Sequence, residues 1–527
     1  MADHAKVAVD AVSLEIFRSS LSAIAEEMGA VLTRSSYSPN IKERRDFSCA
    51  LFDIKGRMIA QAAHIPVHLG SMPDSVATAL AEFDSFAPGD VIAINDPFGG
   101  GTHLPDITLI SPIFVGDDHF GFAANRAHHA DVGGMSAGSM PVATEIYQEG
   151  VIIPPIKLWE GGEPNRAALA LVLRNVRTPD ERRGDLAAQV AANRTAERRI
   201  LELVERSGRE RVDAHIDELI NYAERMTRAT IEGIPDGVYE FTDYLDDDGV
   251  TDEPIAIKAS VTVSGGEMTV DFTGSDTEAR GSINAVASVA RSAVYYIVRC
   301  LMPDEAPSNA GTFAPVTVIA PAGTVVNANP PRPVAGGNVE TSQRITDTVF
   351  GALAKALPDV IPAASQGTMN NVTAGGIDHR TGQPFAYYET MGGGMGARNG
   401  LDGLSGVHVH MSNTLNTPVE AFEFAYPMRI SEYRLRDGSG GTGAARGGDG
   451  LVREISFQVP TEVTLLSERR RIQPWGAQGG EPGQCGENVL IRDGQETQLG
   501  GKKTVNVEPG DRLSIRSPGG GGWGKKR

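Results

Sequence analysis

The stretch THLPDITLISPIFVGDDHFGFAANRAHHAD, residues 102–131, determines how the N-terminal part of the chain is interpreted. Two runs with strand character, 107–115 and 119–129, flank a Gly-Asp-Asp turn at 116–118, which is a hairpin signal. The outer ends of this hairpin carry histidine and aspartate residues. The sequence therefore predicts an antiparallel strand pair with polar side chains gathered at its open end.

The spacing of His103 and Asp106 decides whether these polar residues can act together. On a strand the two side chains would face opposite sides, because side chains alternate with period two. Pro105 and the preceding GGGT favour a turn instead, in which they converge, with His128 close by at the end of the return strand. Neutral imidazoles and carboxylates are typical ligands of divalent metals. A metal site is favoured, and hydrogen-bonded strand ends are the alternative.

Other titratable residues lie near this cluster in the sequence. His64 and His68 in AHIPVHLGS are each a candidate general base or substrate donor. Glu149 in TEIYQEG is a candidate carboxylate base, and a solvated turn is the alternative. Asp46 follows two arginines, the first of them Arg44, a pattern that more often marks a surface ion pair.

Composition excludes several classes of function. The 527 residues include 48 basic and 67 acidic side chains, a net charge of −19, so nucleic acid and anionic membrane are poor partners. The three cysteines form no CxxC pair, which suits a reducing compartment. We expect a soluble cytoplasmic protein, because neither a signal peptide nor a long apolar run is present.

The pattern along the chain predicts a multi-domain α+β fold. An apolar stripe from Ser13 to Arg34 indicates a helix that Ser13 can cap, and residues 164–231 are helical throughout. Alternating runs around Asp-Gly and Gly-Gly turns begin at Gly237. The predicted domains are an N-terminal α+β metal-site domain with long helices, a central domain of antiparallel sheet plus helices, and a C-terminal β-rich domain. They span residues 1–235, 236–427 and 428–527.

The glycine runs do not form a nucleotide site of a known type. None fits GxxxxGK[ST], and none is a GxGxxG between a strand and a helix. The chain is therefore not expected to bind ATP itself. Segments 391–396 and 440–450 are expected to be loops where backbones approach each other or a ligand closely.

Several long blocks resemble the hydantoinase B family, in the same order, from about residue 11 to 524. They are NDPFGGGTHLPDITLISPIF, AHHADVGGMSAGS, EIYQEGVIIPPIKL, NVRTPDERRGDLAAQ, NVETSQRITD, NTLNTPVEAFEFAYPMRISEYRLRDGSGGTGAARGGDGLVREI, RRRIQPWGAQGG and SPGGGGWG. That family comprises B subunits of ATP-dependent hydantoinases and lactamases, the C-terminal half of 5-oxoprolinase, and related carboxylase subunits.

The resemblance implies a hydrolase that opens cyclic amides together with a partner. A separate A subunit with an ATPase fold phosphorylates the amide oxygen of a lactam or hydantoin, and the B subunit completes ring opening with a divalent metal, zinc or manganese. A hetero-oligomer of the two chains is expected. The alternatives are a ketone carboxylase subunit and a non-catalytic scaffold.

The resemblance also implies site residues. By position the metal ligands are Asp46, His103, Asp106 and His128, and which histidine of the pair 128–129 binds stays open. The candidate catalytic residues are His68, His129 and Glu149.

Overall fold

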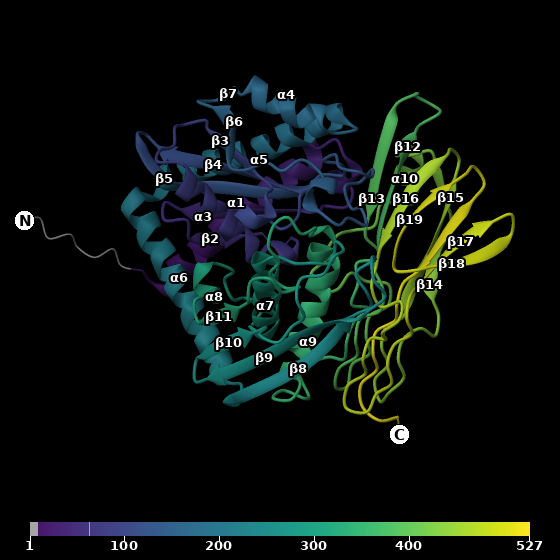
Figure 1. Ribbon diagram of the computed structural model, residues 1–527. Helices are drawn as coiled ribbons and strands as arrows, with labels where there is room; N and C mark the ends of the chain where they lie inside the picture. The colour runs from purple at the N-terminus through teal and green to yellow at the C-terminus, as the bar shows by residue number, and fades with distance from the viewer. Residues whose placement is uncertain (1–8, 63, 527) are drawn as a thin grey trace, which may run out of the picture.

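The structure is a computed structural model that describes residues 9–62 and 64–526. Figure 1 shows the N-terminal sheet and its helices in purple and blue, the yellow C-terminal strands on the opposite side, and the teal central elements packed against both. Helices and antiparallel sheets are combined in one chain, which confirms the predicted α+β class. Among the described residues, no helix is long and apolar enough to cross a membrane.

One antiparallel sheet of seven strands forms the N-terminal part, in the order β2-β1-β5-β4-β3-β6-β7. Val115 pairs with Asp118 where β4 turns into β5, so the predicted hairpin is confirmed. The strands are β1 (Phe47–Asp53), β2 (Met58–Gln61), β3 (Val91–Ile94), β4 (Asp106–Val115), β5 (Asp118–His128), β6 (Ile156–Glu160) and β7 (Glu163–Pro164).

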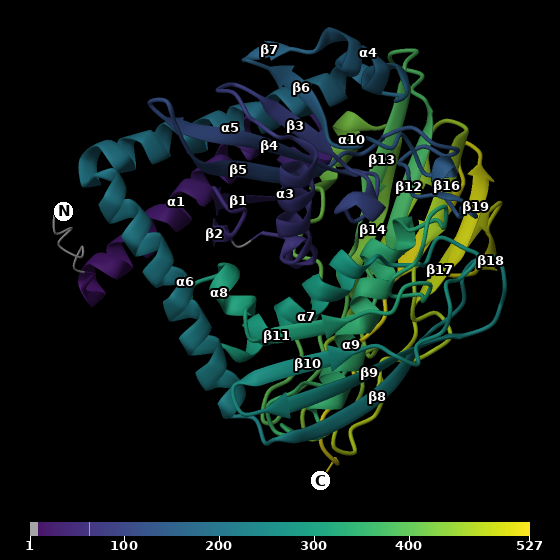
Figure 2. The ribbon, with the colours of Figure 1, turned by 60° about the vertical axis from the view of Figure 1, so that its left-hand side comes forward.

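Helices cover both faces of this sheet, and consecutive residues of β5 face different helices. Ala123 and Ala127 pack with α1, α5 and α6, whereas Phe122 and Ala124 pack with α3. In Figure 2, α5 lies along the sheet and α6 continues down to the central part. The helices are α1 (Ala11–Ser35), α2 (Pro39–Lys42), α3 (Ser71–Glu82), α4 (Arg166–Arg174), α5 (Pro179–Ser207) and α6 (Arg209–Glu232).

The first helix begins earlier than the sequence suggested. Its N-cap is Asp10, whose carboxylate accepts hydrogen bonds from the backbone N–H groups of Val12 and Ser13. The Ser13 hydroxyl in turn accepts a hydrogen bond from the Asp10 backbone N–H, which completes a capping box. The expectation that Ser13 itself caps the helix is wrong, because the charged oxygen three positions earlier satisfies these donors.

The central part contains a four-stranded sheet with helix α9 packed on β8 and β9. The predicted antiparallel pairing from Gly237 is confirmed for β8, β9 and β10, and β11 joins β10 in parallel. A π-helical turn, Gly337–Thr341, leads into α9. The elements are β8 (Gly237–Leu245), β9 (Ile255–Ser264), β10 (Glu267–Asp271), α7 (Ala287–Leu301), α8 (Ala310–Phe313), β11 (Val316–Ile319) and α9 (Ser342–Leu353).

Two further sheets form the C-terminal part, in the orders β13-β12-β16-β19 and β14-β15-β20-β17-β18. Strands from both sides of position 428 thus share a sheet. The elements are β12 (Asn371–Ile377), β13 (Pro384–Glu389), α10 (Val419–Ala425), β14 (Met428–Arg436), β15 (Gly450–Phe457), β16 (Thr461–Leu466), β17 (Glu487–Arg492), β18 (Gln495–Leu499), β19 (Lys502–Val507) and β20 (Arg512–Arg516).

Glycine-rich loops pack backbone against backbone beside these sheets. A Cβ atom added to Gly394 would lie 2.0 Å from the carbonyl oxygen of Gly448 and 2.2 Å from the amide nitrogen of Gly520. Any side chain there would collide with backbone that cannot rotate away. These glycines therefore allow close approach between segments far apart in the sequence.

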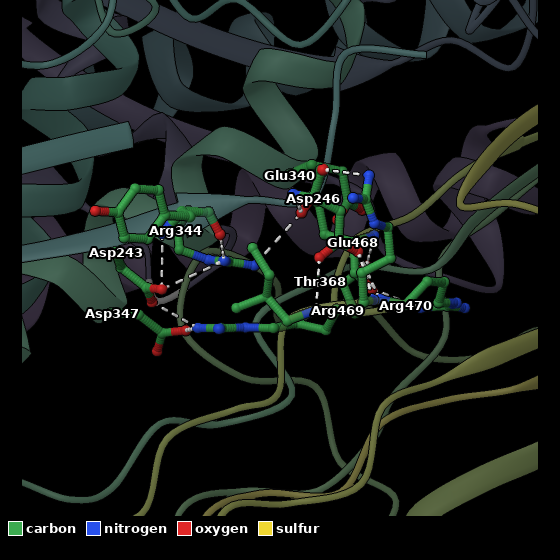
Figure 3. A network of polar contacts seen from close by, with 12 residues as sticks. Asp243, Asp246, Glu340, Arg344, Asp347, Thr368, Glu468, Arg469 and Arg470 are labelled. Atoms are coloured by element: carbon green, nitrogen blue, oxygen red, sulfur yellow. Dashed lines mark hydrogen bonds and ion pairs between the residues drawn. The ribbon is translucent and has the colours of Figure 1, made fainter. Parts of the chain in front are cut away.

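A buried charged network joins the central part to the segment that follows β16 (Figure 3). Arg469 donates to Oδ2 of Asp243 at 2.8 Å and to Oδ2 of Asp347 at 2.7 Å. Beside it, Nη2 of Arg344 lies 3.6 Å from Oε2 of Glu468. Because a buried charge is costly without its partner, these pairs hold the two parts in one relative position.

Candidate metal centre

Three neighbouring strands bring Asp46, His128 and Asp106 to the same level of the sheet. His128 pairs with Asp106 in the β4–β5 ladder. On its other side, the His128 backbone N–H donates to the carbonyl of Asp46 at 3.0 Å, one position beyond the β1–β5 ladder. Directly opposed residues in antiparallel strands point to the same face. The three side chains are therefore placed to meet above one face of the sheet.

His103 reaches this group from the turn before β4. Asp106 N–H donates to the His103 carbonyl at 3.1 Å, and β4 begins only at Asp106. The predicted turn is thus confirmed. It brings Nε2 of His103 to 3.3 Å from Oδ1 of Asp106, although the two residues are three apart.

His103, Asp106 and His128 form a compact cluster of possible ligands. One atom of each lies within 4.8 Å of the others, and all three residues are buried. Nδ1 of His128 is 3.3 Å from Oδ1 of Asp106. Nε2 of His128 is buried without a hydrogen-bond partner among the described residues. Imidazole and carboxylate atoms gathered this closely form a donor set that suits a divalent cation.

The protonation states also suit a metal. The Nδ1–H of His103 donates to the Ala335 carbonyl at 3.3 Å, so Nε2 presents its lone pair to the cluster. Burial lowers the pKa of His128, which keeps its ring neutral at neutral pH. Burial alone would raise the pKa of Asp106, but His103 and His68 beside it hold that pKa well below its usual value. The donor set therefore fits a divalent cation.

A cavity of about 20 Å³ lies at the cluster. Its lining includes Asp46, His68 and Asn338 besides Asp106 and His128. This volume holds a single ion or water. Asp46 thus shares the cavity, but it is not one of the three residues whose ligand atoms lie within 4.8 Å of one another.

Arg44, beside Asp46 in the sequence, is fully buried. It donates to the Tyr388 carbonyl and to the Thr390 hydroxyl, and its Nη2 is 3.8 Å from Oδ2 of Asp46. The interpretation of this arginine as part of a surface ion pair is therefore wrong, because its donors are taken up by a distant segment. Burial raises the pKa of Asp46 above its ordinary value.

His68 contacts the cluster from the 3₁₀ turn Pro66–His68. Its Nε2 lies 3.3 Å from Oδ2 of Asp106, and its Nδ1 lies 2.8 Å from the Ser48 hydroxyl. Burial lowers the pKa of His68. The hydroxyl of Thr102 donates to the same Asp106 oxygen at 2.7 Å. Oδ1 of Asp106 therefore faces His103 and His128, while Oδ2 is held by these outer partners.

His129 and Glu149 are not brought to the cluster. Nε2 of His129 lies 2.9 Å from Oε1 of Gln189 on α5. Glu149 is fully buried rather than solvated, and its Oε1 accepts the backbone N–H groups of Val334 and Ala335 at 2.9 and 3.0 Å. Ala335 is the residue whose carbonyl accepts from His103. The carboxylate thus supports the central segment that contacts the site.

Two residues that sequence reasoning missed complete the surroundings. Nδ2 of Asn338, in the π-helical turn, lies 3.0 Å from Nε2 of His103. Tyr388, in β13, stacks on the His128 ring with centroids 4.2 Å apart and planes 15° apart. Both come from other parts of the fold. The motif NVETSQRITD contains Asn338, but nothing in its local pattern links it to the histidines.

A much larger cavity, about 990 Å³, lies next to the small one, and both are lined by Ile65 and Ser412. The N-terminal helix α1, helix α7 and the segment 408–413 contribute to its walls. A cyclic molecule with substituents fits within such a volume. The cluster is therefore adjacent to a space that can hold a substrate.

Comparisons with known proteins identify the family and the fold of this chain. The family model described as hydantoinase B/oxoprolinase matches residues 10–526. An uncharacterised protein of Methanocaldococcus jannaschii is 44% identical, with 98% of this chain and 91% of that protein covered. The 5-oxoprolinase 1 of Arabidopsis thaliana is 41% identical over 98% of this chain, which spans 42% of the plant protein. The crystal structure of the ATP-dependent caprolactamase from Pseudomonas jessenii matches with a TM-score of 0.92 at 31% identity, covering 98% of this chain and 91% of that one.

Proposed function

The chain belongs to the hydantoinase B/oxoprolinase family, and from this premise we propose that it completes the ATP-dependent hydrolytic opening of a cyclic amide. The observation that carries the proposal is the buried cluster of His103, Asp106 and His128 beside a cavity of about 990 Å³. The similarity to a caprolactamase and to a 5-oxoprolinase supports a cyclic amide as the substrate class.

A divalent ion, zinc or manganese, would be held by His103, Asp106, His128 and Asp46. It would supply Lewis acidity for the attack of water on the amide carbon. His68 is proposed to take the proton of the attacking water, because its buried side chain lines the small cavity beside the cluster. His129 and Glu149 are assigned positioning roles, in line with their contacts to Gln189 and to the Val334 and Ala335 backbone.

The partner is proposed to be an A-type ATPase subunit. It phosphorylates the amide oxygen, since an unstrained amide resists water. Attack on the activated carbon forms a C–O bond and breaks the C–N bond, and the ring nitrogen keeps the electron pair and takes a proton. A second water then releases phosphate, so one lactam, one ATP and two waters yield the amino acid, ADP and phosphate. The phosphorylated species has to be kept from bulk water, which favours a closed hetero-oligomer with at least two copies of each chain.

Reconstitution tests this proposal. The chain is mixed with an A-type subunit, ATP, Mn²⁺ or Zn²⁺ and either 5-oxoproline or caprolactam, and ring opening is followed by chromatography. We expect opening of a cyclic amide only with both chains and ATP, and a loss of at least about 100-fold for His103→Ala. Ring opening by this chain alone, or full activity of His103→Ala, would contradict the proposal. A parallel mixture with acetone and bicarbonate tests the carboxylase alternative, which requires ATP-dependent carboxylation.

A further inference from the structure

Asn338 brings a carboxamide from the central part of the chain into the small cavity. It is 3% exposed, and its Oδ1 is buried without a hydrogen-bond partner among the described residues. Its Nδ2 is 3.0 Å from Nε2 of His103 and 3.4 Å from Oδ2 of Asp106. A buried, half-satisfied amide next to a ligand cluster requires an explanation.

The position of this amide matches that of a metal ligand. Two ligands of one ion, each about 2.1 Å from it, are separated by roughly 3.0 Å in octahedral and roughly 3.4 Å in tetrahedral geometry. Nε2 of His103 and Oδ1 of Asp106 are 3.3 Å apart, and so are Nδ1 of His128 and that oxygen. The terminal nitrogen of Asn338 lies 3.0 Å from Nε2 of His103, a spacing in the same range.

The orientation of the amide depends on what the cavity contains. The Asn338 N–H donates to the lone pair of His103. A cation at that lone pair repels the N–H group and attracts the carbonyl oxygen. A half turn of the side-chain amide exchanges the two terminal atoms and leaves the shape unchanged. The oxygen that now lacks a partner would then face the ion.

The backbone around Asn338 is held firmly. A Cβ atom added to Gly337 would lie 1.7 Å from the carbonyl oxygen of Asn284, so the turn is seated directly on that segment. Ser342 hydroxyl donates to the Asn338 carbonyl at 2.7 Å. Glu149 binds the N–H groups of Val334 and Ala335 just before the turn. The amide is thus presented by a rigid support, which a ligand needs.

We propose that Asn338 is a metal ligand through Oδ1, and this inference rests on the metal centre of the proposed function. It makes the centre depend on the central part of the chain as well as on the N-terminal sheet. A carboxamide oxygen added to imidazoles and carboxylates gives an oxygen-rich set, which favours manganese over zinc.

Metal titration of the full chain tests the assignment. Metal-free protein is titrated with Mn²⁺, and the free ion is followed by electron paramagnetic resonance. Asn338→Ala is expected to raise the Kd for Mn²⁺ at least about tenfold. Asn338→Asp is expected to bind Mn²⁺ at least as tightly as the wild type, because it keeps an oxygen at that place and adds charge. If Asn338 acted only as a hydrogen-bond donor to His103, Asn338→Asp would bind Mn²⁺ more weakly than the wild type, since an aspartate cannot donate.

A matched control separates this effect from general destabilisation. Asn193, on α5, is 1% exposed and donates to the Leu109 carbonyl on the face of the sheet that α1 and α5 cover. Asn193→Ala is expected to keep the wild-type Kd. A Kd of Asn338→Ala within twofold of the wild type, or weakened binding by folded Asn338→Asp, would overturn the assignment. If the wild type itself binds no divalent metal, the metal centre of the proposed function fails as well.

Discussion

His128 is the last residue of β5 and His129 follows it directly, yet their rings have entirely different partners. Nδ1 of His128 is 3.3 Å from Asp106 in the cluster, whereas Nε2 of His129 is 2.9 Å from Gln189 on α5. This follows from the alternation of side chains along a strand. The even-numbered Phe122 and Ala124 face α3, and the odd-numbered Ala123 and Ala127 face α1 and α5.

We therefore predict different effects for alanine at these two positions. His128→Ala is expected to lose a ligand and to raise the Kd for Mn²⁺ at least about tenfold. His129→Ala is expected to keep that Kd and to lower the thermal midpoint, because Gln189 loses its partner. Metal titration and thermal melting of both variants check this. Loss of metal from His129→Ala with normal binding by His128→Ala would reverse the assignment.

Glu149 is expected to make stability depend on pH. Burial raises its pKa from 4.5 to about 8. The folded state therefore binds more protons than the unfolded state between these values, and the free energy of unfolding falls as pH rises through this window. Over the whole window the loss is at most about 5 kcal/mol. Above pH 8, Glu149→Gln is expected to be more stable than the wild type. Parallel stability curves for the two proteins from pH 5 to 9 would contradict this.

The ion pairs of Arg469 are expected to contribute strongly to the free energy of packing between the central and C-terminal parts. Arg469→Met leaves Asp243 and Asp347 buried without this partner, which costs about 3–5 kcal/mol. The control is Arg198→Met, because that side chain is 67% exposed and lies 4.0 Å from Glu202 within α5, so its loss costs less than about 1 kcal/mol. Chemical unfolding midpoints compare the two. Equal midpoints for the two variants would show that the buried network does not stabilise the contact between these two parts.

Glycine packing provides a further prediction. Gly394→Ala places a Cβ atom 2.0 Å from the Gly448 carbonyl oxygen, so we expect a loss of about 1–3 kcal/mol and a lower yield of folded protein. At Gly500 an added Cβ meets nothing within 4 Å, and its φ lies outside the left-handed region. Gly500→Ala is therefore expected to leave the thermal midpoint unchanged. If Gly394→Ala left the thermal midpoint and the yield unchanged, the glycine-rich loops would be able to move apart at little cost.

Much of this molecule follows from local sequence. The hairpin of β4 and β5 could be predicted because strand character and turn residues alternate over short distances. The turn at Pro105 was also predictable, and with it the meeting of His103, Asp106 and His128, since these residues belong to a single supersecondary unit. Asp46 was reached only through the family resemblance, because its own neighbours pointed to the surface.

Tertiary structure alone decided what surrounds this cluster. Asn338 lies 232 positions from Asp106 and reaches it from another part of the fold. Glu149 was a candidate carboxylate base with a solvated turn as the alternative, yet it is buried against Val334, 185 positions away. No periodicity or turn signal encodes such contacts, because they depend on how separately formed units pack against each other. The sequence by itself therefore determined the histidine and aspartate residues of the cluster and their hairpin. Long-range packing determined what surrounds the cluster. It placed the Glu149 carboxyl against the Val334 and Ala335 backbone, and it brought the Asn338 amide to His103.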